Sequence, residues 1–227
     1  MSEGQKIESK HLRPKDAATL VIVRGGDQVL MGVRNAKHAF MPNKYVFPGG
    51  RVDRADGQVA RPVDLKGDVA EKLERGCSPH RARAIGMAVV RETFEETGLI
   101  LGTDIGKSQP TRSANWRPFY DTGFVPALDK IDYIARAITP PGRPRRFDAR
   151  FFMVDADHLV GDLDGNGELL NLTWVPLKEA LELDLPNITQ LMIRFIRQRV
   201  EDGAHLKKGG KIPLVRTIRG QHMIGEH

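Results

Sequence analysis

One segment of the chain, between Ser78 and Gly98, constrains the fold more than any other. Ser78 is a favoured N-cap residue, because its hydroxyl accepts a hydrogen bond from a backbone N–H that the first helical turn leaves free. Pro79 suits the first helical position, and Gly98 suits the left-handed conformation that ends many helices. The sequence therefore predicts a helix over residues 79–97.

This helix has two chemically different sides. At about 100° per residue, Glu92, Glu95 and Glu96 share an arc of about 100°. The opposite side is apolar and carries Met87, Val90 and Phe94. Like charges at these spacings repel one another, and a hard divalent ion such as Mg²⁺ or Mn²⁺ offsets that repulsion when it binds carboxylate oxygens. The alternative is a solvated acidic face without a ligand, and the spacing alone leaves both open.

The remaining segments mix strands and helices without strict alternation. Strands are expected at 17–23, 28–34, 44–47, 147–154 and 171–175, the first two forming a hairpin. Helices are expected at 68–75, 124–138, 177–183 and 188–201. This mixture predicts an α/β or α+β sandwich. We expect one domain over residues 1–227, with a flexible stretch at 1–15.

The composition excludes several classes of protein. With 40% hydrophobic and 28% charged residues, the chain is neither wholly disordered nor collagen-like. Its single cysteine, Cys77, forms no internal disulfide and is expected to be an incidental thiol rather than a nucleophile. The N-terminus lacks a signal-like apolar core, and no long apolar run occurs. We therefore expect a cytoplasmic protein that does not bind membranes.

The charge of the chain points to a class of ligand. A net charge of +6 favours anions such as phosphates and nucleotides. No RNA-recognition motif or interleaved aromatic and basic run is present, so nucleic acid is not an expected partner. The seven histidines lack the spacing of a zinc site. The oligomeric state, including a homodimer, stays open.

Two motifs together resemble a known enzyme family. The first closes a strand with two glycines, as Phe47-Pro48-Gly49-Gly50, where the backbone is open to close approach. The second lies on the predicted helix and reads Arg91-Glu92-Thr93-Phe94-Glu95-Glu96-Thr97-Gly98-Leu99. They are similar to the signature of the Nudix hydrolase superfamily, G-x5-E-x7-R-E-U-x-E-E-x-G-U, where U is a bulky aliphatic residue.

This chain departs from the signature in three places. Thr93 stands at the first U position, and Asp56 stands where the signature has Glu. The signature would then place its Arg at position 64, whereas Arg91 comes 27 residues later. The insertion, assigned to residues 57–77, precedes the helix and leaves the spacing of its three glutamates unchanged. Such a segment is expected to bulge out as a loop.

The resemblance implies a Nudix-like α/β/α sandwich with a mixed sheet and inserted helices. It also implies a Mg²⁺- or Mn²⁺-dependent hydrolase that cleaves the diphosphate linkage of a small-molecule nucleoside diphosphate derivative. The groups implied in metal binding are Glu92, Glu95, Glu96 and the carbonyl of Gly50. Those implied in catalysis are Arg91, which orients the carboxylates, Glu95, and Glu168.

Glu168 is expected to act from a loop. It follows Gly165, Asn166 and Gly167, and Nudix proteins often recruit an acidic residue from such a region as a base or a water-mediated metal ligand. The alternative is a surface residue in a glycine-rich turn. Asp162 and Asp164 are weaker candidates for the same role.

A narrower resemblance concerns the substrate. The pattern Arg34-Asn35-x3-Ala39-x3-Asn43-x3-Phe47-Pro48-Gly49-Gly50 has the spacing of a motif in Nudix enzymes that cleave coenzyme A and acyl-coenzyme A. Those enzymes usually carry Ser or Ala, Arg and Gly at its three middle positions. Arg145-Arg146-Phe147-Asp148-x-Arg150-Phe151-Phe152 is also similar to that branch. The residues expected to bind substrate are Arg34, Lys44, Gly49 and Arg146.

Coenzyme A is thus the leading candidate substrate. ADP-ribose, a nucleotide sugar and a dinucleotide are alternatives within the same enzyme class. A Nudix-like module that binds a ligand without catalysis is the alternative from another class.

Overall fold

The computed structural model describes residues 12–37, 41–60, 63–201, 211–218 and 221–226. Of the stretch expected to be flexible, residues 1–11 lie outside this part, and Lys15 already begins the first strand. Ala39, a position of the substrate motif, also lies outside it.

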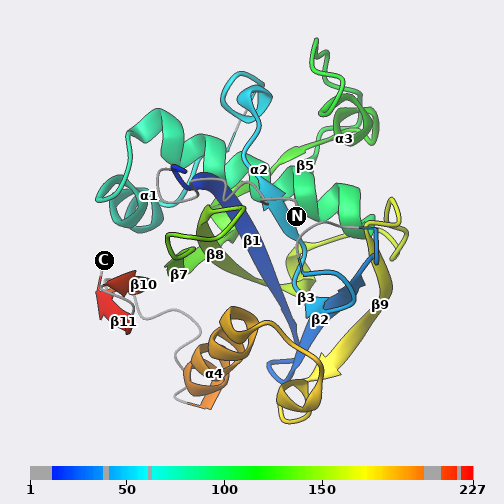
Figure 1. The fold of residues 1–227 in the computed structure, drawn as a ribbon. Coiled ribbons are helices and arrows are strands. Elements are labelled where there is room, and N and C mark those ends of the chain that lie inside the picture. The colour runs from blue at the N-terminus through cyan, green and yellow to red at the C-terminus, as the bar shows by residue number, and fades with distance from the viewer. Residues whose placement is uncertain (1–11, 38–40, 61–62, 202–210, 219–220, 227) are drawn as a thin grey trace, which may run out of the picture.

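A mixed β-sheet forms the centre of the molecule (Figure 1). Its strand order is β11-β10-β7-β8-β1-β2-β3, and in addition β4 pairs with β1 and β9 pairs with β2. The strands are β1 (Lys15–Arg24), β2 (Gln28–Arg34), β3 (Tyr45–Val46), β4 (Gly49–Arg51), β7 (Asp132–Ile138), β8 (Phe147–Asp155), β9 (Leu169–Pro176), β10 (Pro213–Ile218) and β11 (Gln221–Glu226). Strands β5 (Gly102–Asp104) and β6 (Phe124–Pro126) form a separate antiparallel pair. The expected hairpin of β1 and β2 is confirmed, since they pair antiparallel.

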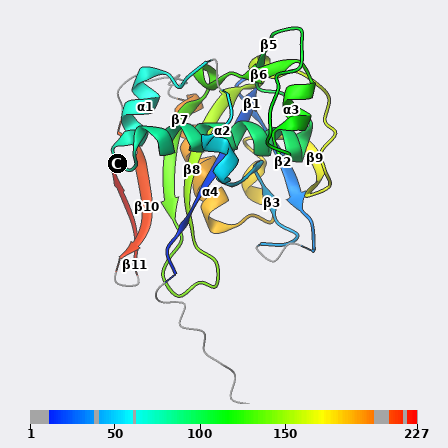
Figure 2. The same ribbon diagram turned by 90° about the horizontal axis from the view of Figure 1, so that it is seen from above.

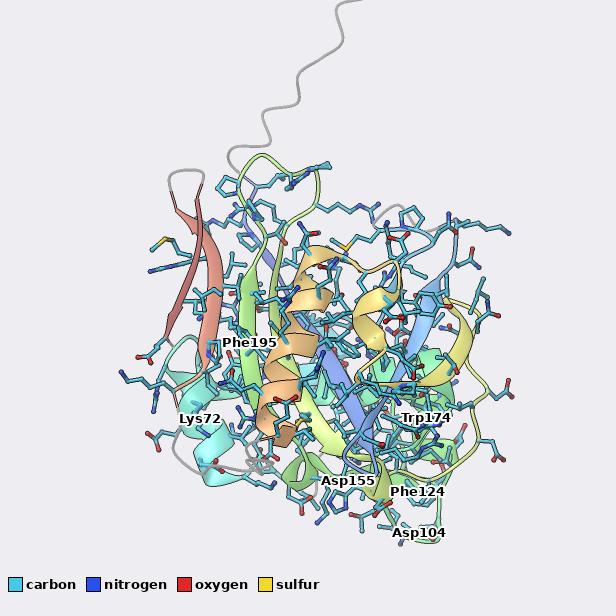
Figure 3. The ribbon with its side chains drawn as sticks, turned by 90° about the horizontal axis from the view of Figure 1, so that it is seen from below. Lys72, Asp104, Phe124, Asp155, Trp174 and Phe195 are labelled. Carbon is cyan, nitrogen blue, oxygen red and sulfur yellow. The ribbon has the colours of Figure 1, made fainter. Side chains whose placement is uncertain are left out.

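Helices cover both faces of this sheet. Helix α2 (Pro79–Thr97) crosses one face, and α4 (Asn187–Glu201) lies on the other (Figures 2 and 3). Alternate residues of β1 point into two separate cores: Leu20 and Ile22 pack in the core that contains α2, and Val21 packs in the core that contains α4. The expected α/β/α sandwich with a mixed sheet is therefore confirmed.

Helix α2 has the ends that the sequence predicts. The Ser78 hydroxyl accepts a hydrogen bond from the backbone N–H of Arg81 at 3.3 Å. Gly98 ends the helix with φ of +77°, a conformation that glycine adopts without the steric cost of a side chain. The apolar stripe is buried at Met87 and Val90 and half-buried at Phe94. Its local signals were sufficient to define the helix.

The predicted helix at 124–138 is wrong. The segment forms β6, the short 3-10 helix η3 (Leu128–Lys130) and β7. β7 pairs with β8 on one side and β10 on the other, so contacts distant in sequence decide its conformation. Pro126 cannot donate a helical hydrogen bond, and the β-branched and aromatic side chains of Tyr133 and Ile134 pack well on a sheet.

The other helix predictions stand as follows. The helix at 68–75 is confirmed as α1 (Gly67–Glu74), and that at 188–201 is confirmed as α4. The segment 177–183 contains the short 3-10 helix η5 (Ala180–Glu182) instead of a longer helix. Three further short helices were not predicted: η2 (Arg54–Gly57), α3 (Arg117–Asp121) and η4 (Ala156–His158).

The inserted segment contributes to the core. Within it, α1 buries Val69 and Leu73 against α2, each only 1% exposed. A surface loop would leave such side chains in water, so this part of the segment is structural. Cys77 lies half-buried after α1 and donates its thiol hydrogen to the Leu73 carbonyl, with the two heavy atoms 3.3 Å apart. None of the helices in the described part of the chain has the length and apolarity needed to cross a membrane.

Candidate functional site

The C-terminal half of α2 lies directly against the two glycines of the Phe47–Gly50 motif. The backbone N–H of Gly49 donates to a carboxylate oxygen of Glu96 at 2.7 Å, and Glu96 is only 2% exposed. A Cβ on Gly50 would lie 2.2 Å from a carboxylate oxygen of Glu92, and one on Gly49 would lie 2.4 Å from the carbonyl of Ala18. Gly49 therefore requires glycine, because its φ is +150° and a side chain would meet the backbone of β1, whereas a side chain at Gly50 would displace the carboxylate of Glu92.

Arg91 is the cation at the centre of this site. Its guanidinium donates through Nε and Nη2 to the two carboxylate oxygens of Asp56, at 2.8 and 3.1 Å, and Nη2 also donates to the carbonyl of Arg51 at 3.0 Å. Its Nη1 lies 2.9 Å from a carboxylate oxygen of Glu92 and 3.1 Å from one of Glu95. A fixed fork of this kind holds the guanidinium and orients both glutamates.

Asp56 is fully integrated into the site despite the insertion that follows it. Its side chain is buried and receives three kinds of donor: the guanidinium of Arg91, the backbone N–H of Asp53 at 2.7 Å, and the indole N–H of Trp116 at 2.9 Å. Because the residue occupies the position of the signature glutamate and binds the signature arginine, the change from Glu to Asp leaves this ion pair intact. Trp116 was not predicted, since nothing in the sequence around it marks a partner 60 residues away.

Burial raises the pKa values of the helix glutamates. For Glu92, burial and then the charge of Glu95 outweigh the stabilising charge of Arg91, and its pKa is about 7. For Glu96, burial and the charge of Glu92 outweigh the hydrogen bond from Gly49, and its pKa is about 8. The pKa of Glu95 is raised for the same principal reason, burial. Arg91 alone therefore does not compensate the negative charge that these residues carry when ionised.

Glu168 and Arg34 lie in the same electrostatic neighbourhood. The charge of Glu168 raises the pKa values of both Glu95 and Glu96, and the charge of Arg34 lowers that of Glu96. Glu168 is exposed at the end of a loop that precedes β9, whereas Arg34 is half-buried at the end of β2. Asp162 and Asp164 belong to the same loop, and their side chains are exposed. The structure thus brings together seven predicted site residues: Arg34, Gly49, Gly50, Arg91, Glu92, Glu95 and Glu96, with Glu168 as an eighth.

Two predicted substrate-binding residues have other contacts. Lys44 pairs with Asp184. Arg146 donates through Nε to the carbonyl of Thr139 at 3.1 Å and through Nη1 to the carbonyl of Leu12. These contacts hold the ends of loops together, and a substrate-binding role for either residue stays a prediction.

Comparison with known proteins begins with two curated relatives. No family model matches the chain. It is 25% identical over 179 residues to a Caenorhabditis elegans protein whose name assigns it provisionally as nudix hydrolase 7, covering 74% of this chain and 53% of that protein. It is 22% identical over 205 residues to acyl-coenzyme A diphosphatase NUDT19 of Xenopus laevis, covering 68% and 54%. The chain thus spans about half the length of these curated relatives.

A solved structure matches most of the fold. The NUDIX hydrolase of Alicyclobacillus acidocaldarius superposes with a TM-score of 0.62 and 25% identity, covering 88% of this chain and all of that one. The chain is therefore similar in sequence to proteins named as Nudix hydrolases, and it has the fold of the solved Nudix hydrolase.

Proposed function

We propose that this chain is a metal-dependent hydrolase that cleaves the diphosphate linkage of a nucleoside diphosphate derivative. One observation carries the proposal: Glu92 and Glu96 of α2 lie against the backbone of Gly50 and Gly49, and Arg91 pairs with Glu92 and with the third glutamate, Glu95. A protein that used this face only for folding would gain nothing from burying carboxylates whose charges remain uncompensated. A bound cation, together with an anionic substrate, would compensate the charges of these carboxylates.

The donor set fits a hard divalent ion. Within the described residues, no three His, Cys, Asp or Glu side chains converge into a group that would enclose a metal ion as they stand. Mg²⁺ does not need such an enclosure, because it usually keeps several waters and is held by one or two carboxylates plus substrate phosphates. Glu92 and Glu96 would supply those carboxylates, Glu95 would bind a further ion, and the carbonyl of Gly50 would add an oxygen.

The chain's own residues would divide the work of hydrolysis as follows. Arg91, fixed by Asp56, keeps Glu92 and Glu95 in one orientation, and the N–H of Gly49 keeps Glu96 in another. Glu168 would accept a proton from a water whose oxygen attacks phosphorus, while the bridging oxygen leaves on the opposite side. A bound divalent ion supplies charge neutralisation for the phosphates and lowers the pKa of the attacking water.

Coenzyme A or an acyl-coenzyme A is the proposed substrate. The motif from Arg34 to Gly50 has the spacing found in enzymes that cleave these molecules, and one relative is named an acyl-coenzyme A diphosphatase. Coenzyme A carries a 3′-phosphate in addition to its diphosphate, so its recognition needs a further cation. Arg34 is half-buried and lies near enough to Glu96 to affect its pKa, which makes it the proposed partner of that phosphate.

A panel of substrates tests this proposal. Coenzyme A, dephospho-coenzyme A, an acyl-coenzyme A, ADP-ribose, a nucleotide sugar and a dinucleoside polyphosphate are each incubated with Mg²⁺, with Mn²⁺ and with EDTA. We expect metal-dependent cleavage of coenzyme A to adenosine 3′,5′-bisphosphate and 4′-phosphopantetheine. Arg34→Ala should raise KM for coenzyme A well above its effect on dephospho-coenzyme A.

Other results would redirect or end the proposal. Cleavage of ADP-ribose, the nucleotide sugar or the dinucleotide in preference to coenzyme A would keep the enzyme class and change the substrate. Equal effects of Arg34→Ala on coenzyme A and its dephospho form would remove Arg34 from 3′-phosphate recognition. Binding of these compounds without cleavage under any condition would favour the non-catalytic module.

A further inference from the structure

The loop that carries Glu168 is fastened to the last turn of α2. This loop, residues 161–168, is called the Glu168 loop below. The backbone N–H of Asp164 donates to the carbonyl of Thr97, and that of Asn166 donates to the carbonyl of Glu95, both at 2.9 Å. These carbonyls belong to the end of the helix, where helical partners run out. The loop is therefore tied to the same turn that presents Glu95 and Glu96.

Two glycines make this contact close. A Cβ on Gly165 would lie 1.9 Å from the carbonyl oxygen of Glu96, and one on Gly98 would lie 2.7 Å from that of Asp162. The two backbones thus touch with no side chain between them. One side of the loop is consequently fixed by main-chain contacts alone.

The other side of the loop is held by Asn35, at the end of β2. Its backbone N–H donates to the carbonyl of Glu168 at 3.0 Å, and its side-chain Nδ2 donates to the carbonyl of Gly167 at 3.1 Å. Its Oδ1 accepts from the backbone N–H of Lys37 at 3.0 Å, which fixes the amide's orientation. The side chain of Asn35 therefore bonds to Gly167, the residue that precedes Glu168, which is 132 residues away in the sequence.

The loop itself offers hinges on both sides of its central part. Gly161 and Gly167 have φ values of +98° and +82°, and residues 161–164 are exposed. Within the loop, the backbone N–H of Glu168 donates to Oδ1 of Asn166 at 2.9 Å, while the glycines leave the backbone large conformational freedom. Loss of the bond from Asn35 is therefore expected to let Gly167, and with it Glu168, move relative to Glu95 and Glu96.

We propose that Asn35 is a positioning residue, which fixes Glu168 beside Glu95 and Glu96 by holding the Glu168 loop from the side opposite α2. This inference rests on the proposed function, in which Glu168 accepts a proton. Asn35 acts through Glu168 and does not touch the substrate. Displacement of a catalytic group by about 1 Å costs up to about 100-fold in rate.

The main test compares two substitutions of the same chemistry. Asn35→Asp keeps the oxygen that accepts from Lys37 and replaces the donor to Gly167 with an oxygen that repels its carbonyl. Asn187→Asp is the matched control, since Asn187 is exposed at the first residue of α4 and lies outside the candidate site. We expect Asn35→Asp to lower kcat about tenfold, with KM and Tm near those of the wild type, and Asn187→Asp to leave kcat and KM unchanged.

A double-mutant cycle separates positioning from general stabilisation. In a Glu168→Gln background, Asn35→Asp should cause no further loss of kcat, because the group that it positions is already inactive. Asn35→Ala, which introduces no charge, should behave in the same way in both backgrounds. An equal loss of kcat with and without the Glu168 carboxylate would overturn the proposal.

Hydrogen exchange provides a readout that needs no activity. In the full chain, the amide hydrogens of Asp164, Asn166 and Glu168 should exchange faster in Asn35→Asp than in the wild type or in Asn187→Asp. The buried amides in the middle of α2 should exchange at unchanged rates. If the amides of the Glu168 loop exchange at unchanged rates in Asn35→Asp, Asn35 does not hold the loop in place. If the wild type cleaves no substrate, the proposed function fails, while exchange still decides whether Asn35 holds the loop.

Discussion

Two groups of charged side chains, each with buried members, lie beside α2, and they are assembled differently. The first, near the N-terminal end of the helix and called the paired cluster, consists of Asp16, Arg81, Arg136, Asp148 and Arg150. Each of its aspartates contacts two arginines, with distances of 2.6 to 3.1 Å at Arg150 and 2.8 Å at Arg136. The second, near the C-terminal end and called the carboxylate cluster, consists of Glu92, Glu95 and Glu96, with Arg91 as its cation.

The pKa values of Asp148 and Glu96 differ in direction for this reason. Burial alone would raise the pKa of Asp148, but the hydrogen bond from Arg136 and the charge of Arg150 outweigh it and hold the pKa below its usual range. Burial raises the pKa of Glu96 to about 8, and the charge of Glu92 adds to the effect. The aspartates of the paired cluster are compensated by three arginines, whereas the three glutamates of the carboxylate cluster have one paired arginine and raised pKa values. Buried charge that the fold leaves uncompensated marks the candidate site more sharply than the number of acidic residues does.

The sharpest separation of the two clusters comes from removing one charge in each. Glu96→Gln and Glu92→Gln preserve shape and helix propensity, and they remove an oxygen charge that would bind the ion. We expect kcat to fall by at least about 100-fold, since phosphoryl transfer depends on electrostatic positioning, while Tm stays the same or rises. Asp148→Asn should do the reverse, lowering Tm with kcat nearly unchanged. Activity above about a tenth of the wild-type value in both glutamine variants would remove these residues as principal ligands.

A second pair of substitutions compares the stability cost of breaking an ion pair in the paired cluster with the cost of breaking an ion pair near the surface. Arg150 is 1% exposed, and its replacement by Met leaves Asp16 and Asp148 with one arginine each. We expect Arg150→Met to lower the free energy of unfolding by about 3 kcal/mol, because breaking a buried ion pair leaves charge unpaired. Arg83→Met, which breaks an exposed pair with Asp64, should cost less than about 1 kcal/mol. Both free energies of unfolding are measured by urea denaturation. Equal losses would mean that the buried ion pairs of the paired cluster stabilise the fold no more than the pair of Arg83 and Asp64 does.

The smallest expected effect is on the pH dependence of stability without metal. Glu96 has a folded pKa of about 8 and a usual value of 4.5, so the folded state binds the extra proton between these values. Stability should therefore fall as the pH rises through this window. Tm of Glu96→Gln should exceed that of the wild type by a few degrees in EDTA at pH above 8, and the difference should shrink toward pH 5.

For Asp148 we expect the pH dependence of stability to have the opposite sign, and to occur at low pH. Its folded pKa lies below its usual value, so its contribution to stability is present above the usual value and lost as the pH falls through the folded one. The acid branch of the stability curve should therefore flatten in Asp148→Asn.

If Mg²⁺ fails to raise the Tm of the wild type at pH 8 more than that of Glu96→Gln, ion binding does not compensate the carboxylate cluster.

Local signals in the sequence were enough for some elements. The cap of Ser78 and the left-handed Gly98 define α2 through contacts within a few residues, and the angular spacing of its glutamates follows from the helix itself. The strand β1 was also predictable, because it is buried on both faces and reads as a continuous apolar run. These features carry the family resemblance.

Contacts distant in sequence could not be predicted. β7 is a strand because β8 and β10 lie on its two sides, and the preference of Tyr133 and Ile134 for a sheet was too weak a signal to predict it. The bond from Trp116 to Asp56 and the bond from Asn35 to Gly167 each join segments whose approach depends on the completed fold. The sequence located the carboxylates and Arg91, but the partners Trp116 and Asn35 became visible only in three dimensions.

The position of Cys77 gives the chain a built-in chemical reporter. Burial raises the pKa of its thiol, although the charges of Arg150 and Arg81 act in the opposite direction. The protonated thiol also donates to the carbonyl of Leu73, so in the native state it reacts slowly with alkylating reagents. Because Cys77 is the single cysteine, a thiol-selective reagent labels the chain only between α1 and α2. A change in the rate of labelling therefore reports a change in the exposure of this junction, without any engineered residue.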